Sequence, residues 1–192
     1  MEDYLIHYGV LGMKWGVRKN NTVFVSGSSK TQTKDSPYYR KTLPNSVKKQ
    51  LDNEMNKKSK IIVGDAPGID RQVQKYLNKK KYNNVEIYSP GDTPRYIANK
   101  NWKNKFVNVP NTEIGSKEWL AGKDKAMSDA ANSGLAVTLD EGSSATKRNI
   151  RRLIDSNKNV YIYELSKNGQ NNDLEIGNNI QTGRKYLERN GF

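Results

Sequence analysis

The stretch KIIVGDAPGID, residues 60–70, decides the fold class. Its first half is a short apolar run typical of a buried strand, and its second half is a turn of small residues. Apolar side chains then recur at helical spacing, with Ile69, Val73 and Leu77 on one face. A strand that passes through a glycine-containing turn into a helix is the repeating unit of α/β proteins with parallel sheets.

The same alternation of strand and helix patterns continues along the chain. The other strand-like runs are TVFVSGS (22–28), NVEIYSP (84–90), GLAVTLDE (134–141) and NVYIYEL (159–165). They are nearly apolar on both faces, as parallel strands covered by helices must be. We therefore predict an α/β fold, a Rossmann-like, open, mainly parallel sheet of about five strands flanked by helices.

Three regions follow from this pattern. We expect residues 22–165 to form the α/β domain, residues 166–192 to form a polar linker with a short C-terminal helix or tail, and residues 1–21 to form an N-terminal tail. Residues 91–115 interleave proline, glycine and asparagine with aromatic residues. Connections of that length are often functional, so we expect a functional loop there.

The N-terminal tail contains HYGVLGMKWGVR, residues 7–18. This segment resembles a motif found at the termini of many tailed-phage structural and virion-associated proteins. The resemblance implies a phage origin and a virion protein as a partner of the tail. The alternative is a strap that packs its apolar side chains onto the domain, namely Tyr8, Leu11, Met13 and Trp15. It also implies that the protein acts in the host cytoplasm or is packaged in the virion.

Composition excludes several function classes. The chain has no cysteine and a single histidine, His7, which argues against thiol nucleophiles, disulfide frameworks, histidine triads and multi-histidine metal centres. We therefore expect no metal and no cofactor. Lysine and arginine total 33 against 20 acidic residues, and the net charge of +13 favours phosphate-bearing or polyanionic partners. The apolar runs are too short to cross a membrane, so we expect no membrane partner.

Three of the predicted strands end in turns of small residues, and the carboxyl ends of parallel strands bound the ligand crevice of open α/β sheets. Glycine lets backbone N–H groups approach an anion, and a following helix N-terminus adds partial positive charge. We therefore expect a phosphate-binding cleft. The candidate ligand-binding residues of these turns are Ser26, Gly27, Ser28, Ser29, Gly64, Asp65, Gly68, Gly142, Ser143, Ser144 and Thr146.

The order VFVSGS, IIVGDAPGID, KDKAM and LDEGSSAT resembles the SLOG superfamily over about residues 22–165. This Rossmann-like group includes YpsA-related proteins, LOG phosphoribohydrolases and DNA processing protein A. The resemblance implies that Asp70 faces a nucleoside pocket. It also implies that Lys123 and Met127 occupy the places of a family arginine and methionine. Lysine lacks the planar fork of arginine, which weakens any catalytic role at this position.

The fourth turn departs from the LOG enzymes, whose PGGxGTxxE motif ends in a catalytic glutamate. When Thr146 is aligned with the family threonine, Lys147, Arg148 and Asn149 fall where that glutamate would lie. The resemblance therefore implies no catalytic residue from this motif, and Lys147 and Arg148 are expected to hold phosphate. If the protein is an enzyme, its carboxylate would come from Asp70, Asp140 or Glu141.

Four functions remain open at this point. The first is binding of a nucleotide, such as an ADP-ribose-type signalling nucleotide that a phage could sequester from host defence. The second is an N-glycosidase or phosphoribohydrolase-type enzyme. The third is nucleic-acid binding like that of DNA processing protein A, favoured by the net charge and the aromatic loop. It ranks behind nucleotide binding, because the basic residues are dispersed along the sequence and no known groove-reading motif is present. The fourth is a virion-associated protein. A nucleotide-derived small molecule is the expected partner, and a homo-oligomer is compatible with each of these functions.

Overall fold

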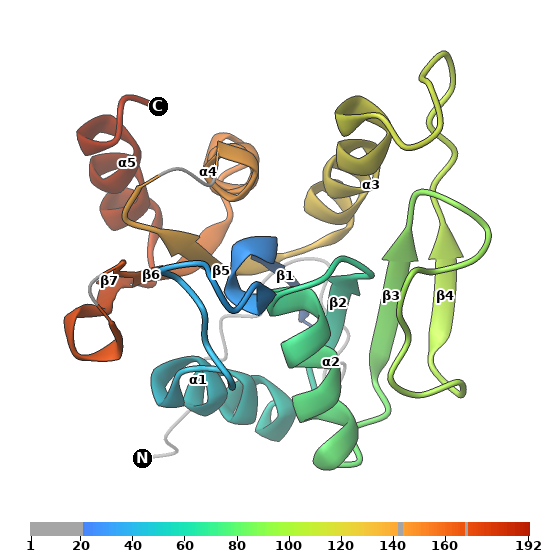
Figure 1. Ribbon diagram of the computed structural model, residues 1–192, viewed down its shortest axis with the longest axis horizontal. Coiled ribbons are helices and arrows are strands. Elements are labelled where there is room, and N and C mark those ends of the chain that lie inside the picture. Colours follow the sequence, from blue (N-terminus) through green and yellow to red (C-terminus); the bar gives the residue numbers. More distant parts are fainter. Residues whose placement is uncertain (1–20, 142–143, 168) are drawn as a thin grey trace, which may run out of the picture.

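The structure is a computed structural model that describes residues 21–141, 144–167 and 169–192. The phage-type motif of residues 1–20, and the turn residues Gly142 and Ser143, lie outside the described residues. A seven-stranded sheet forms the centre of the described part, with α1 and α2 on one face and α3, α4 and α5 on the other (Figure 1). No helix in this part is both long and apolar enough to cross a bilayer.

The elements alternate as the sequence predicts. The strands are β1 (Thr22–Gly27), β2 (Lys60–Gly64), β3 (Val85–Ser89), β4 (Lys103–Phe106), β5 (Ser133–Leu139), β6 (Asn159–Leu165) and β7 (Leu174–Gly177). The helices are α1 (Asn45–Asn56), α2 (Ile69–Lys79), α3 (Lys117–Ala130), α4 (Ser144–Asp155) and α5 (Ile180–Arg189), with short 3-10 turns η1 (Ser29–Gln32) and η2 (Gln170–Asn172).

The strand order is β4-β3-β2-β1-β5-β6-β7. All neighbours are parallel except β7, which runs antiparallel to β6. From β1 the chain moves outward through β2, β3 and β4, then returns to build β5 and β6 on the other side of β1. The strand order therefore reverses between β1 and β5, where open α/β sheets bind ligands. The predicted Rossmann-like α/β fold is confirmed.

The prediction of about five strands is corrected to seven in the described residues, because both outer strands have only four residues and β4 is also polar. Strand β4 has the sequence KNKF and all four of its residues are exposed, so the pattern of a buried strand is absent. It lies inside residues 91–115, which the sequence indicates only as a loop. Strand β7 covers the other edge of the sheet. Short charged strands of this kind are common at sheet edges.

The core has two layers, one on each face of the sheet. Val23 and Val25 of β1 belong to the cluster that contains Val47 of α1 and Val73 of α2. Phe24, which points the other way, belongs to the cluster that contains residues of α3, α4 and α5. This alternation follows from the two-residue period of a strand. It explains why the central strands are apolar on both faces.

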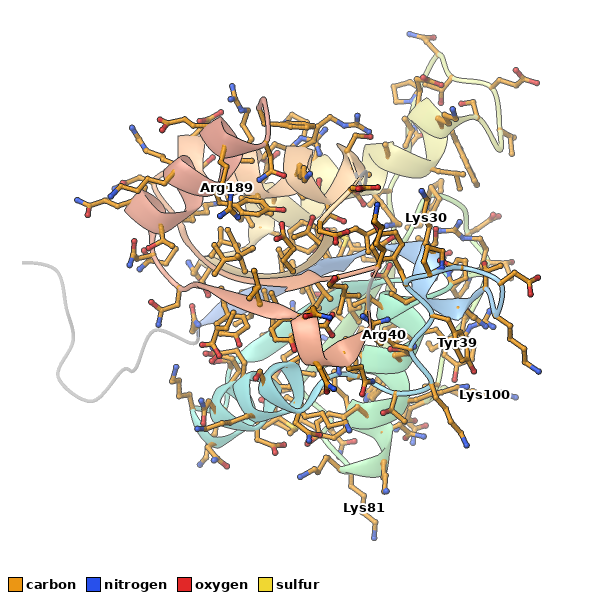
Figure 2. The ribbon with its side chains drawn as sticks, turned by 60° about the vertical axis from the view of Figure 1, so that its left-hand side comes forward. Lys30, Tyr39, Arg40, Lys81, Lys100 and Arg189 are labelled. Atoms are coloured by element: carbon orange, nitrogen blue, oxygen red, sulfur yellow. The ribbon has the colours of Figure 1, made fainter. Side chains whose placement is uncertain are left out.

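A buried ion pair ties the connection between η1 and α1 to the segment before β7. The Arg40 Nη2 atom lies 2.7 Å from Asp173 Oδ1, and both side chains are buried. The same nitrogen donates to the Ser166 carbonyl at 2.8 Å, and the Ser166 N–H donates to Asp173 at 2.8 Å. Figure 2 shows Arg40 inside the molecule, whereas Lys81 and Lys100 project from its surface. The segment before β7 is thus packed onto the body.

Candidate functional site

A cavity of about 610 Å³ lies at the carboxyl end of β1. It is bounded by the turn after β1, the turn between β2 and α2, the helix α3 and the start of α4. This position corresponds to the reversal of strand order between β1 and β5. Such crevices are the usual ligand sites of open α/β sheets, so the cavity is the candidate functional site.

Many of the residues predicted from the strand-end turns meet at this cavity. Those that line it are Ser26, Gly27, Ser28, Ser29, Asp70, Lys123, Ser144, Thr146 and Arg148. The described candidates that do not line it are Gly64, Asp65, Gly68, Met127 and Lys147. Several charged residues that also line it were not named as site residues from the sequence, namely Lys30, Arg95, Lys117 and Asp124. Asn149, which falls where the LOG glutamate would lie, lines it as well.

Gly68 serves the packing of α2, which corrects its expected role as a hydrogen-bond donor to a ligand. Its backbone φ of 83° suits glycine, and an added Cβ would overlap the backbone of Ser28 and Ser29. Its N–H donates to Gln32 Oε1 at 2.9 Å. Gly27 acts similarly, since a Cβ there would overlap Ile69. These glycines bring the start of α2 against the turn after β1.

Two further candidates face away from the cavity. Met127 is fully buried in the core beneath α3. Lys147 is also buried, donates from Nζ to Asn190 Oδ1 at 2.8 Å, and lies 6.0 Å from the centre of the Tyr186 ring. Burial lowers the pKa of Lys147. Its expected contact with phosphate is therefore corrected, because its contacts connect α4 with the C-terminal helix α5.

Asp65 holds Arg95 at the cavity. Arg95 donates from Nη2 to Asp65 Oδ1 at 2.6 Å and from Nε to Oδ2 at 3.0 Å, and its backbone N–H also donates to Oδ2 at 3.0 Å. Burial acts to raise the pKa of Asp65, but these hydrogen bonds outweigh it and lower the pKa. Asp65 thus contributes to the cavity indirectly, by holding the Arg95 side chain that lines it. The only sequence pattern that includes Arg95 is the predicted loop of residues 91–115, with its aromatic residues and prolines.

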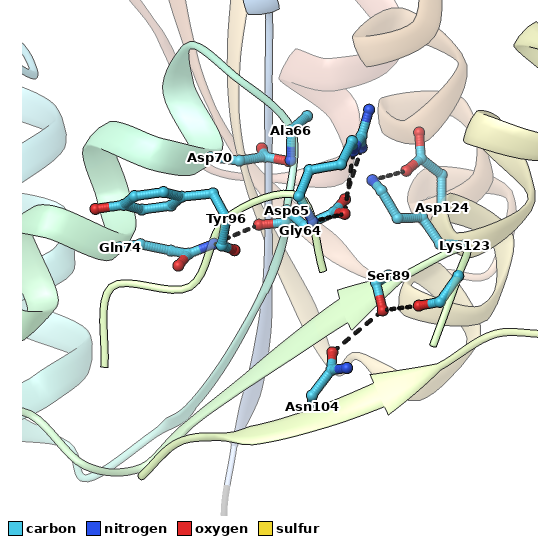
Figure 3. Close-up of polar contacts among 12 residues, drawn as sticks. Gly64, Asp65, Ala66, Asp70, Gln74, Ser89, Tyr96, Asn104, Lys123 and Asp124 are labelled. Atoms are coloured by element: carbon cyan, nitrogen blue, oxygen red, sulfur yellow. Dashed lines mark hydrogen bonds and ion pairs between the residues drawn. The ribbon is translucent and has the colours of Figure 1, made fainter. Parts of the chain in front are cut away.

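A polar network forms one wall of the cavity. Lys123 Nζ lies 2.8 Å from Asp124 Oδ1. Asn149 donates from Nδ2 to Asp124 Oδ2 at 3.0 Å and to Ser26 Oγ at 2.9 Å. The network therefore joins β1, α3 and α4. Figure 3 shows the Lys123 and Asp124 side chains bonded to each other.

Asp70 stands on the first turn of α2 beside this network. It is 5% exposed, and its Oδ2 atom accepts the Ala66 N–H at 3.3 Å. Burial raises the pKa of Asp70 to about 7, the negative charge of Asp124 adds to the rise, and the positive charge of Lys123 opposes it. A Cβ at Gly64 would overlap Asp70 Oδ2 and would lie 2.7 Å from Lys123 Nζ. The glycine therefore leaves room for these two side chains.

Exposed cations surround the mouth of the cavity. Lys30, Lys117 and Arg148 all line it and are exposed. Ser144 and Thr146 bring the first turn of α4, with its helix dipole, to the same cavity. Cationic side chains at a helix N-terminus are well suited to a phosphate group.

Asp140 and Glu141 lie elsewhere, which corrects their candidacy as carboxylates of this site. The Tyr38 hydroxyl donates to Asp140 Oδ1 at 2.6 Å, and Lys167 Nζ lies 2.6 Å from Glu141 Oε1. Neither lines the cavity. Of the three carboxylates named for an enzymatic function, Asp70 alone lines it. Among the described residues, no group of three histidine or acidic side chains could hold a metal ion.

Comparisons with known proteins agree with the fold. No curated protein matches the chain. A family model described as "Family of unknown function (DUF7211)" matches residues 1–22. A solved structure of DNA processing protein A from Helicobacter pylori, from work on its single-stranded DNA binding mode, matches with a TM-score of 0.50 and 14% identity, covering 90% of this chain and 73% of that chain. The likeness shows that the two chains share a Rossmann-like fold.

Proposed function

We propose that the chain binds a nucleotide, with the phosphate held at the mouth of the cavity. The main observation in support is that three cations line the same cavity as the first turn of α4, namely Lys30, Lys117 and Arg148. These residues come from three separate elements, and each supplies positive charge to one place. Phosphate is the group that this combination binds best.

The rest of the cavity suits the remainder of a nucleotide. Its volume of about 610 Å³ lies within the range of small-molecule sites. Pro67, Leu120 and Ala121 supply apolar surface on its walls. An aromatic base has two apolar faces that such surface can cover. The resemblance to the SLOG superfamily over residues 22–165 supports the same class of ligand.

Titration calorimetry with adenosine 5′-monophosphate (AMP) tests this proposal. The Arg148→Ala variant should lose about 1.5–3 kcal/mol of binding free energy, because a hydrogen bond from a charged group is removed. Arg151→Ala is the matched control, since Arg151 is exposed on the same helix but does not line the cavity. Equal losses in the two variants, or no binding of AMP or inorganic phosphate by the wild type, would contradict the proposal.

Single-stranded DNA is a second candidate ligand. It is favoured by the fold shared with DNA processing protein A, whose single-stranded DNA binding is the subject of the matched structure, and by the net charge of +13. Surface cations outside the cavity, such as Lys81 and Lys100, could contact a longer strand (Figure 2). Fluorescence anisotropy with an oligothymidylate should then show tight binding that weakens steeply with salt.

Competition separates the two candidates. If a nucleotide unit of the strand occupies the cavity, AMP should displace the oligothymidylate and Arg148→Ala should weaken both ligands. If the strand binds only the outer surface, AMP should bind without displacing it. Incubation of AMP with the protein followed by chromatography tests turnover at the same time, and we expect AMP to be recovered unchanged. Steady release of adenine would favour the N-glycosidase alternative.

The remaining parts of the proposal concern the biological setting. We propose that the bound nucleotide is an ADP-ribose-type signal that a phage protein would sequester in the host cytoplasm. We also propose that residues 1–21 dock the protein to a virion component, so that the α/β domain of residues 22–165 travels with the particle. Mass spectrometry of small molecules released by heating protein purified from infected cells would identify the ligand, and analysis of purified virions would test the packaging.

A further inference from the structure

We propose that Asp70 receives the vicinal hydroxyl groups of a ribose, so that the cavity binds ribonucleotides in preference to 2′-deoxyribonucleotides. The inference rests on the proposed nucleotide-binding function and names the class of nucleotide. It starts from the side chain itself, because Asp70 is nine-tenths buried and yet lines the cavity.

The carboxyl group of Asp70 lacks partners for its full hydrogen-bonding capacity. Oδ2 accepts one long hydrogen bond, from the Ala66 N–H at 3.3 Å. Oδ1 has no hydrogen-bond partner among residues 21–141, 144–167 and 169–192. An ionised carboxylate can accept about four hydrogen bonds. Oδ1 is not among the fully buried side-chain atoms that lack a partner, so it is open to the cavity that Asp70 lines. A hydrogen-bond donor of a ligand in the cavity can therefore reach this carboxyl group.

The surroundings of Asp70 favour neutral donors over a cation. Lys123 already places its ammonium group beside Asp70, since a Cβ at Gly64 would meet the side chains of both residues. A cationic ligand group at Asp70 would therefore face the charge of Lys123. Hydroxyl groups carry no charge, and two neighbouring hydroxyls can donate to the two oxygens of one carboxylate.

We assign these hydroxyls to the sugar, because other residues of the cavity suit the phosphate and the base. The exposed cations at the mouth, Lys30 and Arg148 among them, suit the phosphate, and the apolar surface of Pro67 and Leu120 suits the faces of the base. The ribose connects the two in any nucleotide. Asp70, on the first turn of α2, lines the same cavity as these residues, and we assign it to the 2′ and 3′ hydroxyls. A deoxyribose would leave one of these hydrogen bonds unmade.

Calorimetry of the full chain at pH 8 tests the inference, with AMP and 2′-deoxy-AMP as probes. We expect the wild type to bind AMP at least tenfold more tightly than 2′-deoxy-AMP. In Asp70→Asn and Asp70→Ala, this ratio should fall toward one, because the acceptor for the paired hydroxyls is weakened or removed. Asp129→Asn is the matched control, since Asp129 is exposed on α3 and does not line the cavity, and it should keep the wild-type ratio.

The possible outcomes separate the inference from the function on which it rests. Equal affinity of the wild type for AMP and 2′-deoxy-AMP would overturn the ribose assignment and leave nucleotide binding intact. Binding of neither probe would overturn both. GMP and 2′-deoxy-GMP form a further arm, because the N–H groups of guanine could also donate to Asp70. If both guanine nucleotides bind equally and far more tightly than AMP, Asp70 reads the base and the assignment to ribose is wrong.

Discussion

Replacing Asp70 by asparagine should make the protein more stable at alkaline pH. Asp70 is 5% exposed, and burial raises its pKa from 3.8 to about 7. The charges that face it are those of Lys123 and Asp124 on α3 and Asp65 at the end of β2. Asparagine has nearly the same shape and carries no charge at any pH, so the variant removes only the cost of ionising this buried group.

The size and sign of the effect follow from the two pKa values. The folded state holds the Asp70 proton more tightly than the unfolded state, so ionisation makes the free energy of unfolding fall as pH rises from about 4 to about 7. Each pKa unit corresponds to about 1.4 kcal/mol, which gives a total cost of about 4 kcal/mol above pH 7. Between pH 5 and pH 8 the variant should gain about 2–3 kcal/mol relative to the wild type.

Urea denaturation at pH 5 and pH 8, followed by tryptophan fluorescence, measures this difference. Asp129→Asn serves as control, because Asp129 is exposed and pairs with Lys125 on the surface, and its effect should be small and nearly independent of pH. If Asp70→Asn and the wild type differ by the same amount at both pH values, Asp70 is not a buried group that resists ionisation. The assignment of Asp70 as a buried carboxyl with free hydrogen-bonding capacity toward the cavity would then lose its physical basis.

Three further predictions concern other parts of the molecule. Arg40→Ala should destabilise the fold by about 3–5 kcal/mol in urea denaturation, because Asp173 is left buried and unpaired, and adding Asp173→Ala should restore part of the loss; a double variant no more stable than Arg40→Ala would argue against this. Gly64→Ala should displace Asp70 and Lys123 and weaken AMP binding at least tenfold in calorimetry, an effect that unchanged affinity would exclude. The preference for AMP over 2′-deoxy-AMP should increase as the pH rises through 7, because the ionised carboxylate of Asp70 is the better hydrogen-bond acceptor. The phosphate groups of both probes titrate alike, so their titration cancels in the ratio of the two affinities. A ratio that does not change with pH would show that ionised Asp70 does not receive the ribose.

The fold could be predicted because its central strands are short and apolar on both faces. Val23, Phe24 and Val25 alternate between two helix layers, and each layer requires an apolar side chain. The edge strands β4 and β7 could not be predicted, because they lack this pattern of apolar residues on both faces. All four residues of β4 are exposed, so its sequence KNKF shows no alternation of apolar and polar residues that would distinguish it from a loop. Its pairing with β3 is made by backbone groups, which every sequence provides.

The sequence also predicted that several strand-end turns meet at one cavity, but it did not predict all the residues that line this candidate site. Small-residue turns after parallel strands must gather at one edge of the sheet, which predicts that Ser26 and Asp70 approach each other. Arg95 reaches the cavity only because Asp65 accepts hydrogen bonds from its guanidinium group and its backbone. Asp65 and Arg95 are 30 residues apart in the sequence, so their contact depends on the fold. No local pattern distinguishes Arg95 from other exposed cations in the chain.

Lys147 and Arg148 show why neighbouring cations must be considered separately. Successive residues of a helix point about 100° apart, so adjacent side chains face different surroundings. In α4, Arg148 lines the cavity, whereas Lys147 is buried against Asn190 and Tyr186 of the C-terminal region. The positive charge available to a ligand is therefore smaller than the run TKRN suggests. Arg148 is therefore the side chain of α4 on which the proposed phosphate binding would depend, whereas Lys147 contacts Tyr186 of α5 and the Asn190 that follows it.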